Sequence, residues 1–204
     1  MNVRLATSIV LLLLCGPALA GEYILTIDGE AYDIGLQRKE TLKLSDGRIL
    51  NVLLVKKETL SHRDDHFSFD YPSRLTPHRR QVREGVSQTT MVSRSGTLVI
   101  VQAFTDFDPR PFVRQTLERL TQRDVQRGYK ITMRKAGRTL SDGTRLTGET
   151  AVATHGDKES TLTVLCHSMG DAGLLFITRT YKGGPREEQQ IVDLFWRTLT
   201  VSTD

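Results

Sequence analysis

The N-terminal part of the chain alternates apolar and polar residues with the period of two that is typical of β-strands. Tyr23, Leu25 and Ile27 share one strand face, and Asp28–Gly29 offers a hairpin turn before the chain returns. A second hairpin pattern follows directly. These patterns predict a small β-meander extension at residues 21–58, ahead of a larger domain.

A polar stretch, Lys56–Asp65, separates this extension from the rest and predicts a linker or domain boundary. Beyond it, Phe67, Phe69 and Tyr71 alternate on one face of a short strand, so three aromatic rings need a core. The segment Leu98–Val101 is continuously apolar, as a strand covered on both faces would be. Helices are therefore expected to pack on this sheet.

Two segments show the helical period near 3.6. The first is residues 109–127, with Asp108 as N-cap and Gly128 as the stop, and the second is residues 185–198. Between them, residues 129–181 predict four antiparallel strands joined by glycine turns. This order predicts an α+β fold, an α/β/α sandwich with a central, mostly antiparallel sheet between two packing helices.

Four segments carry a resemblance to a known family: Phe67–Pro72, Gly128–Tyr129, Leu146–Ala151 and Phe195–Leu199. Together they resemble the PsbP-like superfamily, which includes extrinsic photosystem II subunits, a Ran-binding nuclear import factor and many exported bacterial proteins of unknown role. The resemblance covers about residues 67–201 and implies a PsbP-like α+β domain at residues 66–202, usually a binding or assembly module. Its motifs specify strand starts and helix packing, so no catalytic residue transfers.

Residues 1–20 have the pattern of a secretory signal peptide, with a positive charge, an apolar run, and small residues Ala18 and Ala20 at the −3 and −1 positions. The run is shorter than the about 20 residues that span a bilayer. We expect cleavage after Ala20 and a periplasmic or secreted protein without a transmembrane anchor. Acylation of Cys15 stays open, although Leu14 before it is not the small residue of a lipidation signal.

Charge, cysteine content and the absence of known catalytic motifs argue against several classes of function. Lys and Arg number 28 against 24 Asp and Glu, and this mild excess does not indicate a nucleic-acid-binding protein. After cleavage Cys166 is the single cysteine, so no intramolecular disulfide forms, and its place in an apolar strand predicts a buried thiol. The sequence lacks the motifs of hydrolase nucleophiles, zinc proteases and phosphate-binding loops. We therefore expect no enzyme, no catalytic residue and no cofactor.

The histidines give little support for a metal-binding or catalytic site. The segment His62–His66 is the one local cluster that combines His with carboxylates, but it lies in the predicted linker without helical spacing to converge ligands. A solvated loop is favoured over a metal site. His155 and His167 lie near predicted strand ends on polar faces, which favours surface histidines over catalytic ones.

Arginines are the most suggestive feature of the sequence. Arg79, Arg80 and Arg83 cluster after a proline, while Arg119 and Arg123 flank the apolar stripe of the first predicted helix. These five residues form a candidate partner surface, with an anionic surface as a second kind of target. Because acids share the helix, a solvated helix face is the favoured alternative.

Two function hypotheses follow. The first is a non-enzymatic exported envelope protein, a binding or assembly module that binds another envelope protein. The alternative is a small-ligand or lipid carrier with a cavity between sheet and helix. A hydrolase remains a residual hypothesis, and the sequence leaves open the partner, the oligomeric state and whether the meander packs on the main domain. The cavity would be lined by Phe67, Phe69, Phe104, Phe112 and Phe176, although such residues more often form plain core.

Overall fold

The computed structural model describes residues 23–202, and the chain divides into two compact units between Lys56 and Lys57. Each unit is treated as a separate body. The predicted signal peptide, including Cys15 and Ala20, lies outside the described residues. None of the described helices is long and apolar enough to cross a membrane.

The smaller unit consists of two separate antiparallel hairpins rather than one continuous meander. In the first, Asp28 and Gly29 both take positive φ angles, 51° and 88°, which matches the right-handed twist of a tight hairpin. An isolated bridge joins Leu36 to Leu54. The strands are β1 (Tyr23–Ile27), β2 (Glu30–Ile34), β3 (Lys39–Lys43) and β4 (Ile49–Leu53), and the buried apolar residues are Ile34, Leu42 and Leu44.

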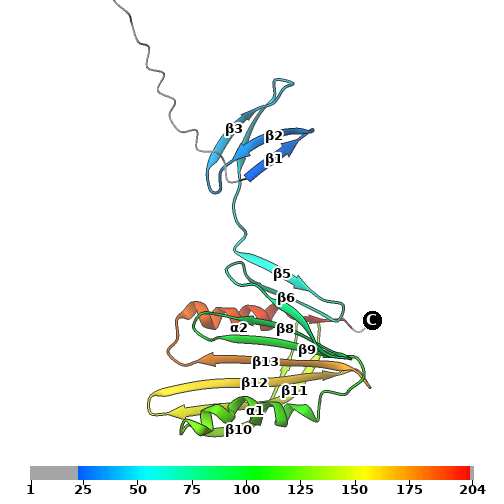
Figure 1. The fold of residues 1–204 in the computed structure, drawn as a ribbon, viewed down its shortest axis with the longest axis vertical. Helices are drawn as coiled ribbons and strands as arrows, with labels where there is room; N and C mark the ends of the chain where they lie inside the picture. Colours follow the sequence, from blue (N-terminus) through cyan, green and yellow to red (C-terminus); the bar gives the residue numbers. More distant parts are fainter. Residues whose placement is uncertain (1–22, 203–204) are drawn as a thin grey trace, which may run out of the picture. The chain divides into compact units, whose positions relative to one another are not determined.

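The larger unit is built on a seven-stranded antiparallel sheet with the order β10-β11-β12-β13-β9-β8-β7 (Figure 1). A second, three-stranded sheet has the order β14-β6-β5, and two helices complete the unit. The large sheet contains β7 (His78–Arg83), β8 (Val86–Val92), β9 (Leu98–Phe104), β10 (Lys130–Thr139), β11 (Arg145–His155), β12 (Lys158–Ser168) and β13 (Gly173–Tyr181). The other elements are β5 (Thr59–Arg63), β6 (Phe67–Pro72), β14 (Thr200–Val201), α1 (Phe112–Gln126) and α2 (Arg186–Thr198).

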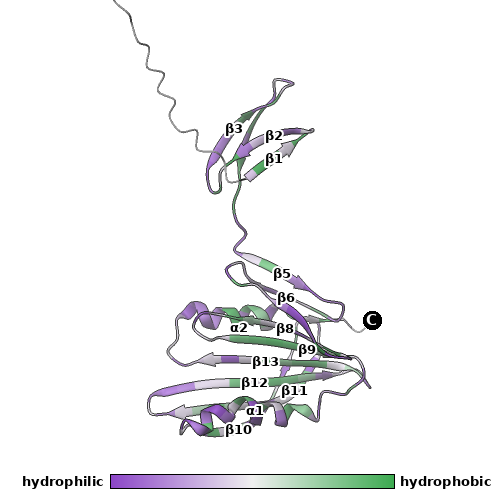
Figure 2. Cartoon of the chain, viewed as in Figure 1, coloured by the Kyte–Doolittle hydropathy of each residue, from purple (hydrophilic) through white to green (hydrophobic). Residues whose placement is uncertain are grey.

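The large sheet is buried on both faces, because its central strands alternate between two cores. On β13, Leu175 and Ile177 point to the face that packs against α1, here called the α1 face. Leu174 and Phe176 point to the opposite α2 face, which packs against α2 and β6. Figure 2 shows the apolar stretch of β9 within this sheet. Burial on both faces explains why β9 and the first half of β13 are almost entirely hydrophobic.

The core of the α2 face is rich in aromatic rings. Phe195 and Trp196 of α2 lie edge to face, with ring centroids 4.8 Å apart, and Phe69 meets Phe195 at 5.1 Å. Full burial of such a side chain contributes about 1.5–3 kcal/mol relative to leaving it exposed. These contacts fasten the three-stranded sheet and α2 to the large sheet as one packed layer.

The expected α+β class is wrong, because strands make up 53% of the fold and helices only 16%. The protein is mostly β. The polar segment Lys56–Asp65, predicted as a linker, contains β5, and the arginine-rich segment His78–Arg83 forms β7. Both are edge strands of their sheets, where side chains need no apolar alternation, so their sequences give no strand pattern.

Candidate functional site

The candidate site is a groove of about 340 Å³ on the α1 face, between α1 and the strands β7, β8 and β9. Helix α1 packs mainly over β10, β11 and β12, which leaves part of the sheet beside it without a helix. We call this hollow the α1 groove. It is lined by Val82, Arg83, Val86, Gln102, Phe104, Phe112, Gln115, Thr116 and Arg119.

The floor of the α1 groove is apolar. Val86 and Phe104 are opposite each other in the register of β8 and β9, and both are buried. The Phe104 ring stacks on Phe112, the first residue of α1, with centroids 6.0 Å apart and an angle of 2° between the planes. A rigid aromatic pair beneath an open hollow is suited to hold an apolar side chain of a partner.

A row of polar side chains forms one wall. Gln102 donates from Nε2 to Oε1 of Gln88 at 2.9 Å, and Gln88 donates from Nε2 to Oγ1 of Thr90 at 2.8 Å. This chain of hydrogen bonds orients Gln102 without using its own carbonyl oxygen. Gln115 of α1 is exposed on the other side of the groove. Both amides are therefore available to hydrogen-bond the backbone of a ligand.

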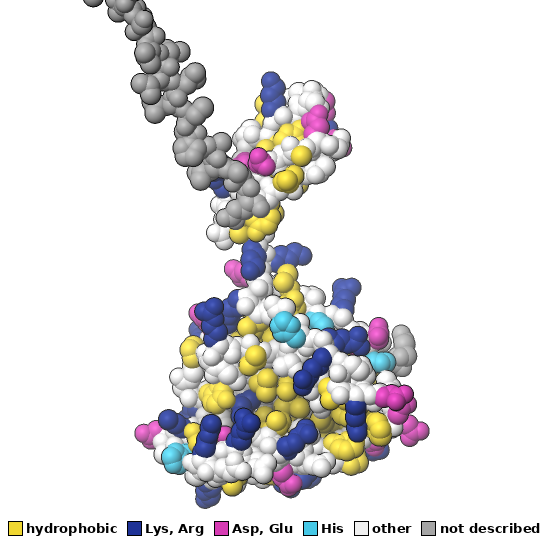
Figure 3. Space-filling model, viewed as in Figure 1, with side chains coloured by type: hydrophobic (Ala, Val, Ile, Leu, Met, Phe, Trp, Pro, Cys, Tyr) yellow, Lys and Arg dark blue, Asp and Glu magenta, His cyan; other side chains and the backbone are white. Residues whose placement is uncertain are grey.

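Four of the five predicted arginines lie around this groove. Arg83 and Arg119 line it, Arg80 is the register partner of Gln88 on the same sheet face, and Arg123 follows Arg119 by one helical turn. No described carboxylate forms an ion pair with any of the four, and Arg83 lies over the ring of Phe107 at 5.0 Å. Figure 3 shows hydrophobic side chains in the middle of the larger unit with Lys and Arg around them.

The fifth arginine has a different role. Arg79 points to the α2 face and pairs through Nε with Oδ2 of Asp64 at 2.9 Å, and the Asp64 side chain is only 2% exposed. Adjacent residues of a strand point to opposite faces, which separates Arg79 from Arg80. Arg79 therefore does not belong to the groove surface. The sequence does not reveal this, because the exposed segment His78–Arg83 has no apolar alternation that would predict a strand and its two faces.

The histidine cluster is not the solvated loop that the sequence favoured. His62 lies in β5 with its ring 5.2 Å from that of Phe69, and burial lowers its pKa, although Asp64 opposes that shift. Nε2 of His62 and Oδ1 of Asp64 are buried without hydrogen-bond partners. Within residues 23–202 no group of three His, Cys, Asp or Glu side chains is placed to hold a metal ion.

A second hollow on the α1 face, about 480 Å³, lies between the start of α1 and β10 to β12. Its centre is the buried Glu149, whose carboxylate pairs with Arg114 at 3.0 Å and Lys135 at 2.7 Å. Cys166 donates from its thiol to the Thr147 carbonyl at 3.3 Å, and burial raises the pKa of that thiol. Arg114 comes from α1 and Lys135 from β10, and both pair with the one buried acid of β11, so this cluster ties α1 to the sheet. The histidines at 155 and 167 do not line it.

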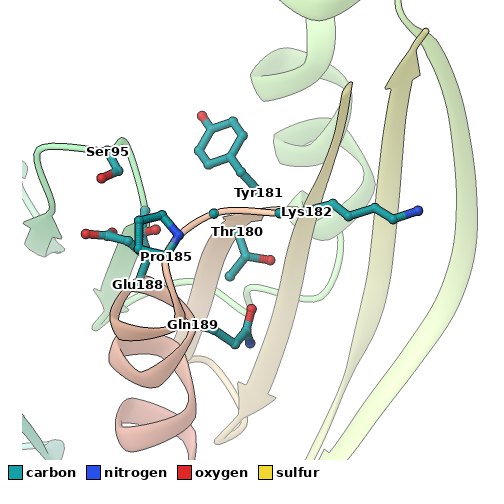
Figure 4. A pocket seen from close by; sticks show the side chains of 10 residues that line it. Ser95, Thr180, Tyr181, Lys182, Pro185, Glu188 and Gln189 are labelled. Atoms are coloured by element: carbon teal, nitrogen blue, oxygen red, sulfur yellow. The ribbon is translucent and has the colours of Figure 1, made fainter. Parts of the chain in front are cut away.

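A third hollow, about 310 Å³, lies where β13 leads into α2 (Figure 4). Figure 4 shows Ser95, from the turn between β8 and β9, near Pro185 and Glu188 at the start of α2. Burial alone would raise the pKa of Glu188, but hydrogen bonds from Ser93 and its neighbours outweigh burial and hold that pKa below its ordinary value. The arrangement anchors the start of α2 to the β8–β9 turn.

The five phenylalanines proposed to line a carrier cavity do not surround one cavity between the sheet and a helix. The sheet separates the five phenylalanines, because Phe67, Phe69 and Phe176 belong to the filled core of the α2 face. Only Phe104 and Phe112 lie on the α1 face, where they meet the groove. Sequence alone could not distinguish the faces, since each ring is equally apolar.

Comparisons with known proteins give little further information. No protein family matches the chain, and no curated protein does. A crystal structure at 1.50 Å from Bacteroides thetaiotaomicron VPI-5482 is similar at 16% identity and a TM-score of 0.30. The similarity covers 67% of this chain and 45% of the other, and at that TM-score it carries no argument about fold or function.

Proposed function

We propose that this chain is a non-enzymatic exported protein of the cell envelope that binds another protein through the α1 groove. The observation that carries the proposal is the placement of Arg83 and Arg119 at one apolar hollow with no Asp or Glu in its lining. The two residues come from β7 and α1, which are distant in sequence. The PsbP-like resemblance, as a binding or assembly module, points in the same direction.

The groove chemistry favours an acidic, partly apolar segment of the partner. Guanidinium groups bind carboxylates through two parallel hydrogen bonds, and aromatic and arginine side chains carry much of the energy in protein interfaces. A hydrophobic residue of the partner would pack on Phe104 and Phe112, while flanking carboxylates meet Arg83 and Arg119. The amides of Gln102 and Gln115 would pair with its backbone.

A small-molecule carrier is the second candidate. The groove volume of about 340 Å³ is near the lower end of the roughly 300–1,000 Å³ of ligand pockets, which bury most of a ligand. Val82 at its edge is 46% exposed. Such an open hollow suits a protein segment better than an enclosed ligand. Native mass spectrometry of protein purified from its own envelope tests the carrier, which predicts a co-purifying small molecule.

The protein-binding proposal is tested by photo-crosslinking in intact cells that produce the protein. A photoreactive amino acid at Gln115 should give an adduct with another envelope protein. The yield of this adduct should fall at least about tenfold in a variant with Arg83→Glu and Arg119→Glu, because the reversed charges repel an acidic segment. The same photoreactive residue at Gln190, exposed on α2, is the matched control.

Two results would refute the proposal. One is the absence of a protein adduct from Gln115 while the purified protein is folded. The other is an adduct that is equally strong from Gln190 or that is unaffected by the two charge reversals. Salt should also weaken binding to the purified partner, since the arginines are exposed.

A further inference from the structure

The two edges of the large sheet differ in their capacity to accept another strand. At one edge, β7 is six residues long and its register shifts between Gln81 and Arg83. Such a bulge protects an edge from further pairing. At the other edge, β10 pairs with β11 over ten residues without a register shift and contains no proline. Figure 1 shows β10 at the end of the sheet, beside α1.

The backbone groups that β10 leaves free can be assigned from its register. Leu140, just after β10, donates its N–H to the carbonyl of Thr144 at 2.9 Å, so this pair is of the hydrogen-bonded type. Hydrogen-bonded pairs alternate along an antiparallel ladder, so the even residues of β10 bond to β11. The odd residues, including Ile131, Met133 and Lys135, then direct their N–H and C=O groups outward. No described strand pairs with that side.

The side chains of this edge are charged with one sign. Lys130, Arg134, Lys135 and Arg138 are basic, and β10 has no acidic residue. Lys135 is paired with Glu149, and Arg138 lies over the Trp196 ring at 5.0 Å.

Lys130 and Arg134 are exposed and have no ion-pair partner among the described residues. They lie on the α2 face of the strand, as does Arg138, whereas Ile131 and Met133 lie on the α1 face and pack against its core. The edge is therefore basic on the α2 face, whereas its α1 face is apolar at Ile131 and Met133 and continues with Lys135, which is paired with Glu149.

A second copy of the chain is a poor occupant. Antiparallel pairing of two β10 strands about a two-fold axis requires residues of equal parity to face each other. A register centred on Arg134 places Arg134 against itself and Lys130 against Arg138. A register centred on Met133 avoids such direct opposition, but every two-fold register gathers Lys130, Arg134 and Arg138 of both copies on one sheet face. Like charges directly opposite each other are destabilising. The same charges attract an acidic strand.

We propose that β10 binds an extended acidic segment of another protein, which adds to the sheet as an eighth, antiparallel strand. Its carboxylates would face Lys130, Arg134 and Arg138, and the alternate side chains would be apolar and cover Ile131 and Met133. The added backbone would hydrogen-bond to the outward groups of the odd residues. This surface is distinct from the α1 groove and does not depend on it.

The test uses the full mature chain and a fluorescent peptide of alternating glutamate and valine, about nine residues long. The peptide should bind, and the binding should weaken as salt is raised. A peptide of alternating lysine and valine is the matched control and should not bind. Arg134→Glu should weaken binding at least about tenfold, whereas Arg94→Glu, at an exposed arginine in the β8–β9 turn, should not.

A backbone substitution separates strand addition from simple charge attraction. Met133→Pro removes an outward N–H and no bond to β11. It loses only the partly buried packing of the Met133 side chain, so its thermal midpoint should fall less than that of Thr132→Pro, while the folded variant should lose peptide binding. Thr132→Pro removes an inward bond and should lower the midpoint. Amide hydrogen exchange at Ile131 and Met133 should slow when the peptide is added to the unaltered chain.

Absence of binding by the glutamate–valine peptide to the folded chain would overturn the proposal. So would equal binding by the Met133→Pro variant, or no slowing of exchange at Ile131 and Met133. The variant with Arg83→Glu and Arg119→Glu should still bind the peptide. Failure at β10 is thereby distinguishable from failure of the α1 groove as a binding site.

Discussion

At the scale of single residues, Arg79 and Arg80 are adjacent in β7 but differ in what they contact. Arg79 neutralises the buried Asp64, whereas Arg80 has no described ion-pair partner. Arg79→Ala should therefore lower the free energy of unfolding by about 2 kcal/mol, because it leaves a buried carboxylate unpaired. Arg80→Ala should change it by less than about 0.5 kcal/mol. Urea unfolding of both variants measures the difference.

Adding Asp64→Asn to the Arg79→Ala variant is the control for this mechanism. The neutral amide removes the unpaired charge, so part of the lost stability should return. Equal stability of the two arginine variants would contradict the assigned role of Asp64. If the double variant is no more stable than Arg79→Ala alone, the lost free energy of unfolding is due to packing of the Arg79 stem instead.

His62 gives a pH dependence with a defined sign. Burial lowers its pKa in the folded protein from the ordinary 6.5, so the unfolded chain takes up this proton first as pH falls. The stability due to neutral His62 is complete above that ordinary value and is lost as pH decreases below it. His62→Gln, which does not titrate, should therefore lose less stability than the unaltered chain between about pH 7 and about pH 5.

Urea unfolding at both pH values measures this difference. The neighbouring carboxylate of Asp64 is present in both proteins, so it does not account for a change in slope. An equal or steeper loss in His62→Gln would show that the histidine is not held neutral by its contacts with Phe67 and Phe69.

At the scale of elements, the sequence predicted the helices, the central strands and the edge strand β10, but missed the two polar edge strands β5 and β7. Residues 185–198 and α2 (Arg186–Thr198) nearly coincide, because proline and an apolar stripe mark that helix. Helix α1 begins at Phe112 instead of Pro109, and Asp108 pairs with Arg110 instead of capping the helix. Strands β5 and β7 were missed, since neither carries an apolar pattern.

Gly148 permits the close approach of the neighbouring strands β11 and β12. A side-chain carbon at this position of β11 would collide with the Val164 carbonyl oxygen and lie 2.9 Å from Cα of Leu165 on β12. Gly148→Ala should therefore destabilise the protein by about 1–3 kcal/mol, because backbone must move to admit the methyl group. Thermal unfolding followed by circular dichroism measures the change.

Gly137→Ala on β10 is the matched control. Its added carbon would lie 3.2 Å from the Leu146 carbonyl oxygen, a tight but smaller conflict. The variant should lose less stability than Gly148→Ala. The reverse order, or no effect at Gly148, would mean that the β11–β12 approach is not as close as the structure describes.

At the scale of the whole molecule, the sequence indicated which residues form the core but not the proportion of strand to helix. Each apolar run was assigned to an element, yet the exposed strands that raise the β content are polar. The candidate site was partly predictable. Arg83 and Arg119 were selected from the sequence, whereas the groove between them depends on α1 leaving part of the sheet uncovered, a tertiary feature that no local pattern encodes.

The two compact units lead to a prediction about folding. The larger unit buries two cores on opposite sheet faces, whereas residues 23–56 bury only Ile34, Leu42 and Leu44, contain no cysteine, and form two-stranded sheets. Isolated two-stranded hairpins are marginal in water, and chains below about 40 residues usually need a disulfide, a metal or a partner to fold.

A fragment of residues 57–204 should therefore melt cooperatively at nearly the midpoint of the longer chain, while a peptide of residues 23–56 should show no cooperative transition. Circular dichroism of both, compared with the mature chain, tests this. If the fragment were unfolded, the small hairpins would be part of the core, and the larger unit would owe its stability to them. If the peptide melted cooperatively, its exposed Ile24, Ile49 and Val55 would have to be covered by self-association, which a dependence of the midpoint on concentration would reveal.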